Sequence, residues 1–478
     1  MKRRIRIHVT VAALLVAALA LGPAQSSWAQ NNGGGNNQGG NQGNGGGGGL
    51  PLPAGVIVSP DGVLKIMRAR DASGGLTKKW QAEAKSRLNA NVAKPSELRK
   101  VSLNRLEAAL ADRIANGQAP SDEMKALAGL TRLQYVFFYP DSKDIVVAGP
   151  AEGFAPDPTG RLIGIQSGRA VLQLEDLVVA LRAFPPAGDP TNVISVSIDP
   201  TVQGLQQMQQ FLVSIAGRVR PGDAGAIVQG LKQNLGLQTV TVQGISDKTH
   251  YAQVLVEADY RMKLIGIGLE EPPAKIASYV SRANPRDVSR NALQRWYFTP
   301  NYDCVRVSDD ELAMELVGDG VKLIGANELV QADGTRANAA AGNAASTAFC
   351  ASFTAQYPQL ARKSAVYAQM RNLIDMAIAA AYVQKQDFYS QAGWKMDVLG
   401  DEQKYPVETY EAPKTVETAC TAVWKGKTLM TPVGGGVRIE ATQAIAKENR
   451  LTDEQGALKV MRQKVSVQGL GVNQWWWD

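Results

Sequence analysis

Residues 192–265 read NVISVSIDPTVQGLQQMQQFLVSIAGRVRPGDAGAIVQGLKQNLGLQTVTVQGISDKTHYAQVLVEADYRMKLI. Apolar and polar residues alternate over 192–198, which predicts a strand that ends at Asp199-Pro200. Helical spacing follows over 202–215 and 223–235, a second strand is predicted over 240–245, and Ser246 is the predicted N-cap of a long helix. Strands that alternate with helices imply a mixed, layered α/β sheet covered by helices. This stretch therefore decides the predicted fold class, α+β.

The flanking sequence extends this pattern into two predicted domains. Residues 50–273 form a mixed α/β domain, and residues 274–478 form a β-rich domain with a tryptophan-rich C-terminus. Turn residues between short apolar runs predict a hairpin around Pro140-Asp141-Ser142-Lys143 and a β-meander over 295–324. A helical pair, parted by Pro358, and further strands follow the meander.

The N-terminal segment has the composition of an export signal. Four basic residues stand within residues 2–6, thirteen mostly apolar residues follow over 9–21, and Ser27-Trp28-Ala29 is a small-x-small cleavage site. We therefore predict a signal peptide over 1–29 and an exported protein, periplasmic or secreted. Residues 30–49 contain only Asn, Gln and Gly, which predicts a disordered, low-complexity segment.

The apolar part of the signal is too short for a stable membrane anchor. A spanning helix needs roughly 20 residues, and no later stretch is apolar enough to span. We expect no transmembrane segment after cleavage, with a retained signal anchor as the alternative. Removal of the four basic residues of the signal from 51 leaves 47 against 44 acidic residues, a net charge of +3 in place of +7. No dense basic stripe is present, so nucleic acid is not an expected partner.

Histidine and cysteine usage limits the chemistry. His250 is the only histidine outside the predicted signal, which excludes zinc sites of several imidazoles and a H-E-x-x-H motif. No G-x-S-x-G or P-loop is present, and no complete G-x-G-x-x-G occurs outside the Asn/Gln/Gly-rich segment. We therefore predict no metal and no cofactor. Cys304, Cys350 and Cys420 have no metal-ligand spacing, and either three buried thiols or one disulfide fits them.

The helix after Ser246 holds most of the candidate site residues. His250, Glu257 and Arg261 share a polar face, and Glu257–Arg261 and Asp259–Lys263 are i,i+4 pairs. In one interpretation His250 is a base or ligand, Glu257 and Asp259 are catalytic carboxylates, and Arg261 and Lys263 bind an anion. In the other, the face is solvated and carries ordinary ion pairs. Asp259 borders the apolar stripe, so it needs a partner or a shifted pKa.

Three further motifs have a structural and a functional interpretation each. Glu152 lies between glycines in a loop after a predicted hairpin, and such loops often carry function. Gly434-Gly435-Gly436 lacks the Lys-Ser/Thr of a phosphate loop, which favours a flexible or bulged strand entry. Trp475, Trp476 and Trp477 are suited to stacking on a sugar or docking on a partner, or they close a groove on the protein's own surface.

Several strings of the chain resemble one protein family. They are LRKVSLNRLEAAL, LAGLTRLQYVFFYPDSKDIVVAGPAEGF, VLQLEDLVVALR, SIDPTVQGL, HYAQVLVEADYRMKLIGIGLEEPP, RWYFTP and MRNLIDMAIAAA. Together they are similar to a family of exported planctomycete proteins catalogued as domain of unknown function 1598. The likeness runs from about Gly55 to Gly436. It implies export and a shared fold, and it assigns no activity and no site residue.

These observations leave three classes of function. The first is an interaction or scaffold protein of the cell envelope, with an envelope protein or polysaccharide as partner. We expect this class, because the signatures of an enzyme are missing. The second is an exported hydrolase that uses carboxylates, with His250, Glu257, Asp259 and Glu152 as candidates. The third is a saccharide- or peptide-binding module that uses the terminal tryptophans.

Overall fold

The computed structural model describes residues 53–478, except 69, 70, 72, 287, 289–291, 339–342, 408, 409, 466, 468 and 472. The predicted signal peptide and the Asn/Gln/Gly-rich segment lie outside the described residues. The described residues form one compact unit. This unit combines helices with mixed sheets, so the predicted α+β class is confirmed.

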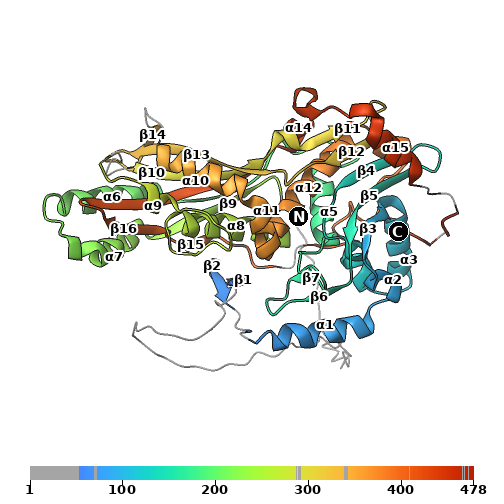
Figure 1. Ribbon diagram of the computed structural model, residues 1–478, viewed down its shortest axis with the longest axis horizontal. Helices are drawn as coiled ribbons and strands as arrows, with labels where there is room; N and C mark the ends of the chain where they lie inside the picture. Colours follow the sequence, from blue (N-terminus) through green and yellow to red (C-terminus); the bar gives the residue numbers. More distant parts are fainter. Residues whose placement is uncertain are drawn as a thin grey trace, which may run out of the picture. The chain divides into compact units, whose positions relative to one another are not determined.

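A ten-stranded sheet forms one side of the fold (Figure 1). Its path in order is β1 (Pro53–Val58), β2 (Val63–Arg68), β15 (Thr415–Glu417), β9 (Leu237–Gln243), β8 (Ile194–Asp199), β17 (Thr428–Ile439), β10 (Ala292–Pro300), β13 (Val321–Val330) and β14 (Arg336–Asn338), with β16 (Cys420–Trp424) paired to β17. Strands from both sides of residue 273 therefore alternate within one sheet, and the predicted boundary at 273 does not separate sheets.

A second sheet has seven strands, and a third has two. The seven-stranded order is β18 (Arg450–Leu451), β11 (Val305–Val307), β12 (Ala313–Leu316), β4 (Tyr135–Tyr139), β5 (Asp144–Ala151), β3 (Ser96–Ser102) and β19 (Trp476–Trp477). The small sheet pairs β6 (Phe154–Pro156) with β7 (Leu162–Gly164). The β4–β5 hairpin confirms the hairpin predicted around residues 140–143.

The predicted meander over 295–324 is wrong in its pairing. The four strands exist, but β10 pairs with β13 in the larger sheet, and β11 pairs with β12 in the smaller one. The turn at Gly318-Asp319-Gly320 thus connects two sheets instead of two partners. Apolar alternation marks a strand, but it carries no information about which strand lies beside it.

Fifteen α-helices cover these sheets within the described residues. They are α1 (Gly75–Arg87), α2 (Ala90–Ala93), α3 (Leu103–Ala115), α4 (Asp122–Lys125), α5 (Leu174–Ala183), α6 (Val202–Ser214), α7 (Ala224–Leu235), α8 (His250–Gly266), α9 (Tyr279–Arg282), α10 (Ala344–Ala355), α11 (Tyr357–Lys363), α12 (Ala365–Lys385), α13 (Phe388–Ala392), α14 (Ala441–Ala444) and α15 (Ala457–Lys464). No helix of this described part has both the length and the apolar character needed to cross a membrane.

The order of elements predicted over residues 192–265 is confirmed. The inward residues of β8 are Ile194, Val196 and Ile198, as the alternation predicts. Thr201 caps α6, where its hydroxyl accepts a hydrogen bond from the Gly204 N–H at 2.9 Å. The predicted cap at Ser246 is wrong, because the Thr249 hydroxyl accepts from the first turn of α8 instead. Both residue types cap well, and the sequence does not distinguish two caps three residues apart.

Two further predictions need correction. The helical pair is a run of three helices, α10, α11 and α12, with breaks at Gln356 and Ser364. Pro358 does not separate helices. It lies in the first turn of α11, where a backbone N–H would have no acceptor within the helix, so its absence costs no hydrogen bond. Gly434–Gly436 do not form a flexible strand entry. They lie buried inside β17, which continues through them between β8 and β10.

Candidate functional site

Helix α8 lies at the centre of the unit and is buried on nearly all sides. It packs on β8, β10 and β17 of the ten-stranded sheet and also on α5 and α12. Fourteen of its 17 residues are buried. The prediction of a solvated polar face is therefore wrong: Glu257 and Arg261 are 1% and 2% exposed. Buried charges need partners, so the polar residues of α8 must be satisfied within the fold.

A pocket of about 200 Å³ opens beside the N-terminal half of α8. His250, Gln253 and Glu257 line it from the helix, Arg161 from the loop between β6 and β7, and Tyr410 from the chain before β15. We call it the His250 pocket. The side chain of His250 is 16% exposed, so a ligand in the pocket can reach the imidazole. The structure thus brings two of the predicted catalytic residues, His250 and Glu257, into one cavity.

His250 is paired with a carboxylate from another helix. Its Nδ1 lies 3.0 Å from both carboxylate oxygens of Asp176, in the first turn of α5. Burial lowers the pKa of His250, but the Asp176 and Glu175 carboxylates outweigh it, so the pKa is raised above its ordinary value. Burial, together with the charge of Asp176, also raises the pKa of Glu175, which accepts a hydrogen bond from the Tyr410 hydroxyl at 3.3 Å.

The opposite wall of the pocket is an ion-pair chain. The Arg161 guanidinium pairs with Glu257 and donates its Nε–H to Gln369 on α12 at 2.7 Å. The predicted i,i+4 pair of Glu257 and Arg261 is confirmed, because the Arg261 Nη1 lies 3.5 Å from Glu257. The Nη2 of Arg261 lies 2.6 Å from Glu270. Glu257 is therefore held between two arginines.

This geometry supports hydrogen bonding and proton transfer more readily than covalent catalysis. Among the described residues that line the His250 pocket there is no Ser or Cys, and the Thr159 hydroxyl is bonded to Asp157. These residues offer no free nucleophile for a Ser-His-Asp mechanism. Within the described ranges, no group of three or more His, Cys, Asp or Glu side chains is arranged to hold a metal ion.

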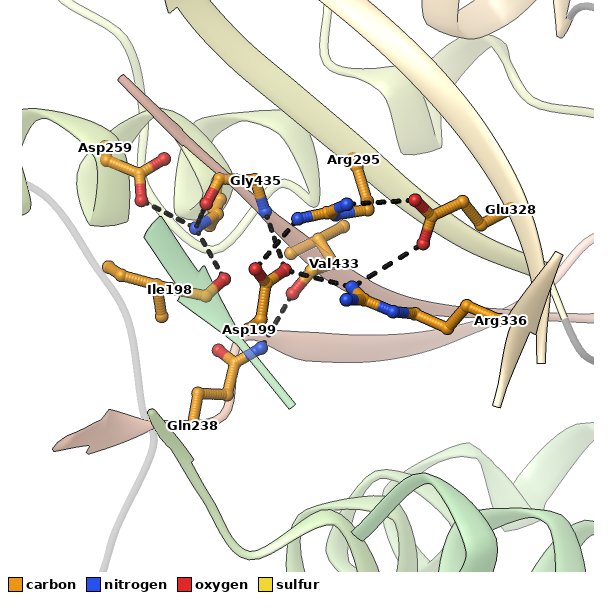
Figure 2. Close-up of polar contacts among 10 residues, drawn as sticks. Ile198, Asp199, Gln238, Asp259, Arg295, Glu328, Arg336, Val433 and Gly435 are labelled. Carbon is orange, nitrogen blue, oxygen red and sulfur yellow. Dashed lines mark hydrogen bonds and ion pairs between the residues drawn. The ribbon is translucent and has the colours of Figure 1, made fainter. Parts of the chain in front are cut away.

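Asp259 and Lys263 face the ten-stranded sheet, where the Lys263 amine bonds to β8 and β17. Figure 2 shows Asp259 beside these strands. Both side chains are fully buried, and the Lys263 amine lies 2.6 Å from Asp259, which confirms the predicted pair. The amine also donates to the carbonyls of Ile198 at 3.0 Å and Gly435 at 3.2 Å. Burial raises the pKa of Asp259 to about 6, although Lys263 lowers it. The pair thus joins helix to sheet, and neither residue lines the His250 pocket.

Four partly buried charges continue this network at the end of β8. Arg295 lies 2.8 Å from Asp199 and 2.9 Å from Glu328, and Arg336 bridges the same two carboxylates at 3.5 and 3.6 Å (Figure 2). These residues come from strands β8, β10, β13 and β14, so the network connects four strands across the sheet.

Glu152 has a structural position. Its carboxylate accepts hydrogen bonds from the backbone N–H groups of Gln166, at 2.7 Å, and of Ser167, and also from the Ser167 hydroxyl. These bonds fix the turn after β7. Glu152 does not line the His250 pocket, so the structure does not unite it with the other catalytic candidates.

The terminal tryptophans dock on the protein's own surface. Trp476 and Trp477 form β19 at the edge of the seven-stranded sheet, and Trp475 and Trp477 are buried. Arg99 stacks over Trp476 at 4.7 Å and pairs with Asp478 at 2.8 Å. A depression of about 680 Å³ adjoins them. Most of the surface of these side chains is thus covered by the protein itself, which favours the structural interpretation.

The three cysteines are separate buried thiols. Burial raises the pKa of Cys304 and Cys350 to about 12 and that of Cys420 to about 11. A thiol is reactive as its thiolate, so these residues are inert at neutral pH. They fill core space, as the first of the two sequence interpretations holds.

Sequence reasoning missed Arg161, which lines the His250 pocket, and the partners Asp176 and Gln369 that hold His250 and Arg161 in place. Arg161, Asp176 and Gln369 lie in three separate segments, and no spacing rule connects them to α8. Asp176 stands in the apolar helix VLQLEDLVVALR, where an acidic residue in the first turn is ordinary. A buried histidine needs a hydrogen-bond partner, and this requirement was the one sequence signal that a partner such as Asp176 exists.

Replacement of Asp176 by asparagine should lower the pKa of His250. In the native protein we expect a value above about 6.5, and without the carboxylate the lowering by burial dominates. The charged pair stabilises the fold below pH about 6.5, and this stability is lost as the pH rises through the raised folded pKa. A proton NMR titration of the imidazole measures the shift, with Glu175→Gln as a milder comparison. An unchanged pKa in Asp176→Asn would contradict the assignment.

The fold and the pocket define an α+β protein with a buried polar helix that connects a sheet to a small cavity. Residues 196–279 match the family model described as "Protein of unknown function (DUF1598)". The predicted resemblance to this family is confirmed for that segment, which runs from β8 to the start of α9 and includes His250, Gln253 and Glu257. No curated protein and no solved structure matches the chain.

Proposed function

We propose that this protein is exported and binds a saccharide in the His250 pocket. The observation that carries the proposal is a small cavity whose walls present both donors and acceptors while their charges are already paired. Arg161 is paired with Glu257, and His250 with Asp176. Because these charges are already paired, the wall should bind an ion weakly, and it suits a neutral ligand. Sugar hydroxyls both donate and accept, so they fit a wall that does the same.

The size and the aromatic side of the pocket support the same class of ligand. A volume of about 200 Å³ is below the range of about 300–1,000 Å³ typical of drug-sized ligands. It suits one sugar unit, or the end of a chain. Tyr410 lies with its ring centre 6.0 Å from that of His250, and Val254 adds an apolar wall. The N-terminal sequence supports export, and an exported protein would meet envelope polysaccharide.

Binding to a panel of neutral sugars tests the proposal. We expect saturation-transfer NMR to identify at least one bound mono- or disaccharide. Gln253→Ala should weaken its binding about tenfold, the worth of one or two hydrogen bonds. Gln253 is the suitable variant, because its amide donates at the surface to the Glu411 carbonyl and leaves the buried charges intact. Arg362→Ala, outside this pocket, is the control. No saturable sugar binding, or equal loss in both variants, would reject the proposal.

Hydrolysis is a second candidate, favoured by the Asp176–His250 pair alone. A carboxylate-paired imidazole beside a bound sugar is placed to take a proton from water. Release of reducing ends from a bound oligosaccharide would support this candidate, and His250→Gln should then abolish turnover while binding persists. Binding without turnover leaves the binding function standing. A scaffold role in the envelope gains no specific support from the described residues.

A further inference from the structure

Four arginine side chains converge on a second pocket, of about 250 Å³. Arg132 comes from the chain before β4, Arg169 from the turn after β7, Arg362 from α11 and Arg371 from α12. Asp319 is the only acidic side chain among the described residues that line it. We call it the arginine pocket. It shares no lining residue with the His250 pocket.

The buried end of the arginine pocket holds an arginine that is only loosely paired. Arg371 is 8% exposed, and its buried Nε–H has no hydrogen-bond acceptor. Its nearest carboxylate oxygens are loose contacts, at 3.6 Å in Asp319 and 4.0 Å in Asp375. Asp375 must also serve Arg132, at 3.4 Å. Burial, together with the charge of Arg132, lowers the pKa of Arg371 despite these carboxylates.

The outer end adds two exposed guanidinium groups. Neither Arg169 nor Arg362 forms an ion pair with any part of the chain that the structure describes. Four arginines thus face Asp319 and the buried Asp375, an excess of two positive charges. Like charges gathered in one concave site repel one another unless a counter-ion is bound. An anion bound in this pocket would offset that excess.

We propose that the arginine pocket binds a dianionic phosphate group, either inorganic phosphate or the terminal group of a small phosphomonoester. The guanidinium fork matches phosphate oxygens in pairs, so four arginines can hold one group from several directions. A charge of −2 balances the excess of two. The volume also leaves room for a small organic group beside the apolar residues Pro150, Pro358 and Ala361. This proposal does not rest on saccharide binding.

Calorimetric titration of the full chain with inorganic phosphate, a small phosphomonoester, sulfate and acetate tests the proposal. We expect saturable phosphate binding that weakens with added salt. Arg169→Ala and Arg362→Ala should each weaken it about tenfold or more, the loss typical of one charge-assisted hydrogen bond. Both side chains are exposed, so these variants should fold. Lys363→Ala is the matched control: it removes a positive charge from the same helix, next to Arg362, at a residue that does not line the pocket.

The outcomes separate the sources and the alternatives. Tighter binding of the phosphomonoester than of inorganic phosphate assigns the site to an ester, and the reverse assigns it to the free ion. Acetate binding as tightly as phosphate would reject the dianion. An equal loss in Lys363→Ala and Arg362→Ala would reduce the effect to general surface charge and overturn the proposal. No saturable binding would overturn it too. His250→Gln should leave phosphate binding unchanged, which keeps this test independent of the proposed sugar site.

Discussion

Replacement of Lys263 by methionine should cost about 3–5 kcal/mol of unfolding free energy, the range for removal of one partner of a buried ion pair. Lys263 and Asp259 are both 0% exposed. Without the amine, the Asp259 carboxylate would remain in the core with no counter-charge, and one of its oxygens already has no hydrogen-bond partner. Two carbonyls, of Ile198 and Gly435, would lose their donor as well.

The pH dependence of the Lys263 variant follows from Asp259. Its pKa is already raised to about 6 by burial, and loss of Lys263 raises it further. Protonation removes the buried charge, so the deficit of the variant should be largest at neutral pH and shrink as the pH falls through the raised pKa. Denaturant unfolding at several pH values measures this.

Two comparison variants isolate the effect of burial. Lys79 and Glu83 on α1 are also an i,i+4 pair, 4.0 Å apart, but they are 70% and 49% exposed. Lys79→Met should change stability by about 0.5 kcal/mol or less. The double variant Lys263→Met/Asp259→Leu should recover most of the loss, because apolar replacement of a whole buried pair is often neutral. A loss below about 1 kcal/mol in Lys263→Met would contradict the role of the pair.

The contrast between these pairs shows what the sequence reveals and what it does not. The spacing of Asp259 and Lys263 is as visible in the sequence as that of Lys79 and Glu83, so the pairing could be predicted. Burial could not. A helix with charges four residues apart is typical of a solvated surface, and only the ten-stranded sheet on one side and α12 on the other make α8 a core helix.

The same reasoning explains the fate of the other predictions. Elements over residues 192–265 were predictable because alternation and capping are local. Sheet membership was not, because β17 lies between β8 and β10 although long stretches of chain separate the three strands. The His250 pocket depends on such long-range placement too: Arg161 and Asp176 reach α8 only after the chain has folded. A prediction made from one helix therefore identified the pocket residues on α8 and missed those from other segments.

Gly435→Ala should prevent folding or cost more than about 4–5 kcal/mol, the range of exceptional single substitutions. Gly435 has φ +126°, and a Cβ placed on it would lie 1.9 Å from the Trp296 carbonyl oxygen and 2.7 Å from the Trp296 nitrogen. Both are backbone atoms of β10, the paired neighbour of β17, so they cannot rotate away as a side chain would. The clash would separate strands at the centre of the ten-stranded sheet.

Two other glycines separate backbone strain from steric overlap. Gly426 has φ +72° with no atom within 4 Å of the point that a Cβ would occupy, so Gly426→Ala should cost only the strain, about 1–2 kcal/mol. Gly225 has neither problem and lies in α7, so Gly225→Ala should be neutral or stabilise by about 0.4–1 kcal/mol. Thermal unfolding of the three variants should rank them in this order. If Gly435→Ala unfolded near the temperature of Gly426→Ala, the steric explanation would be contradicted, and the positive φ of Gly435 alone would explain the glycine. The contact distances favour the steric explanation, because β10 lies too close to β17 to leave room for a Cβ at Gly435.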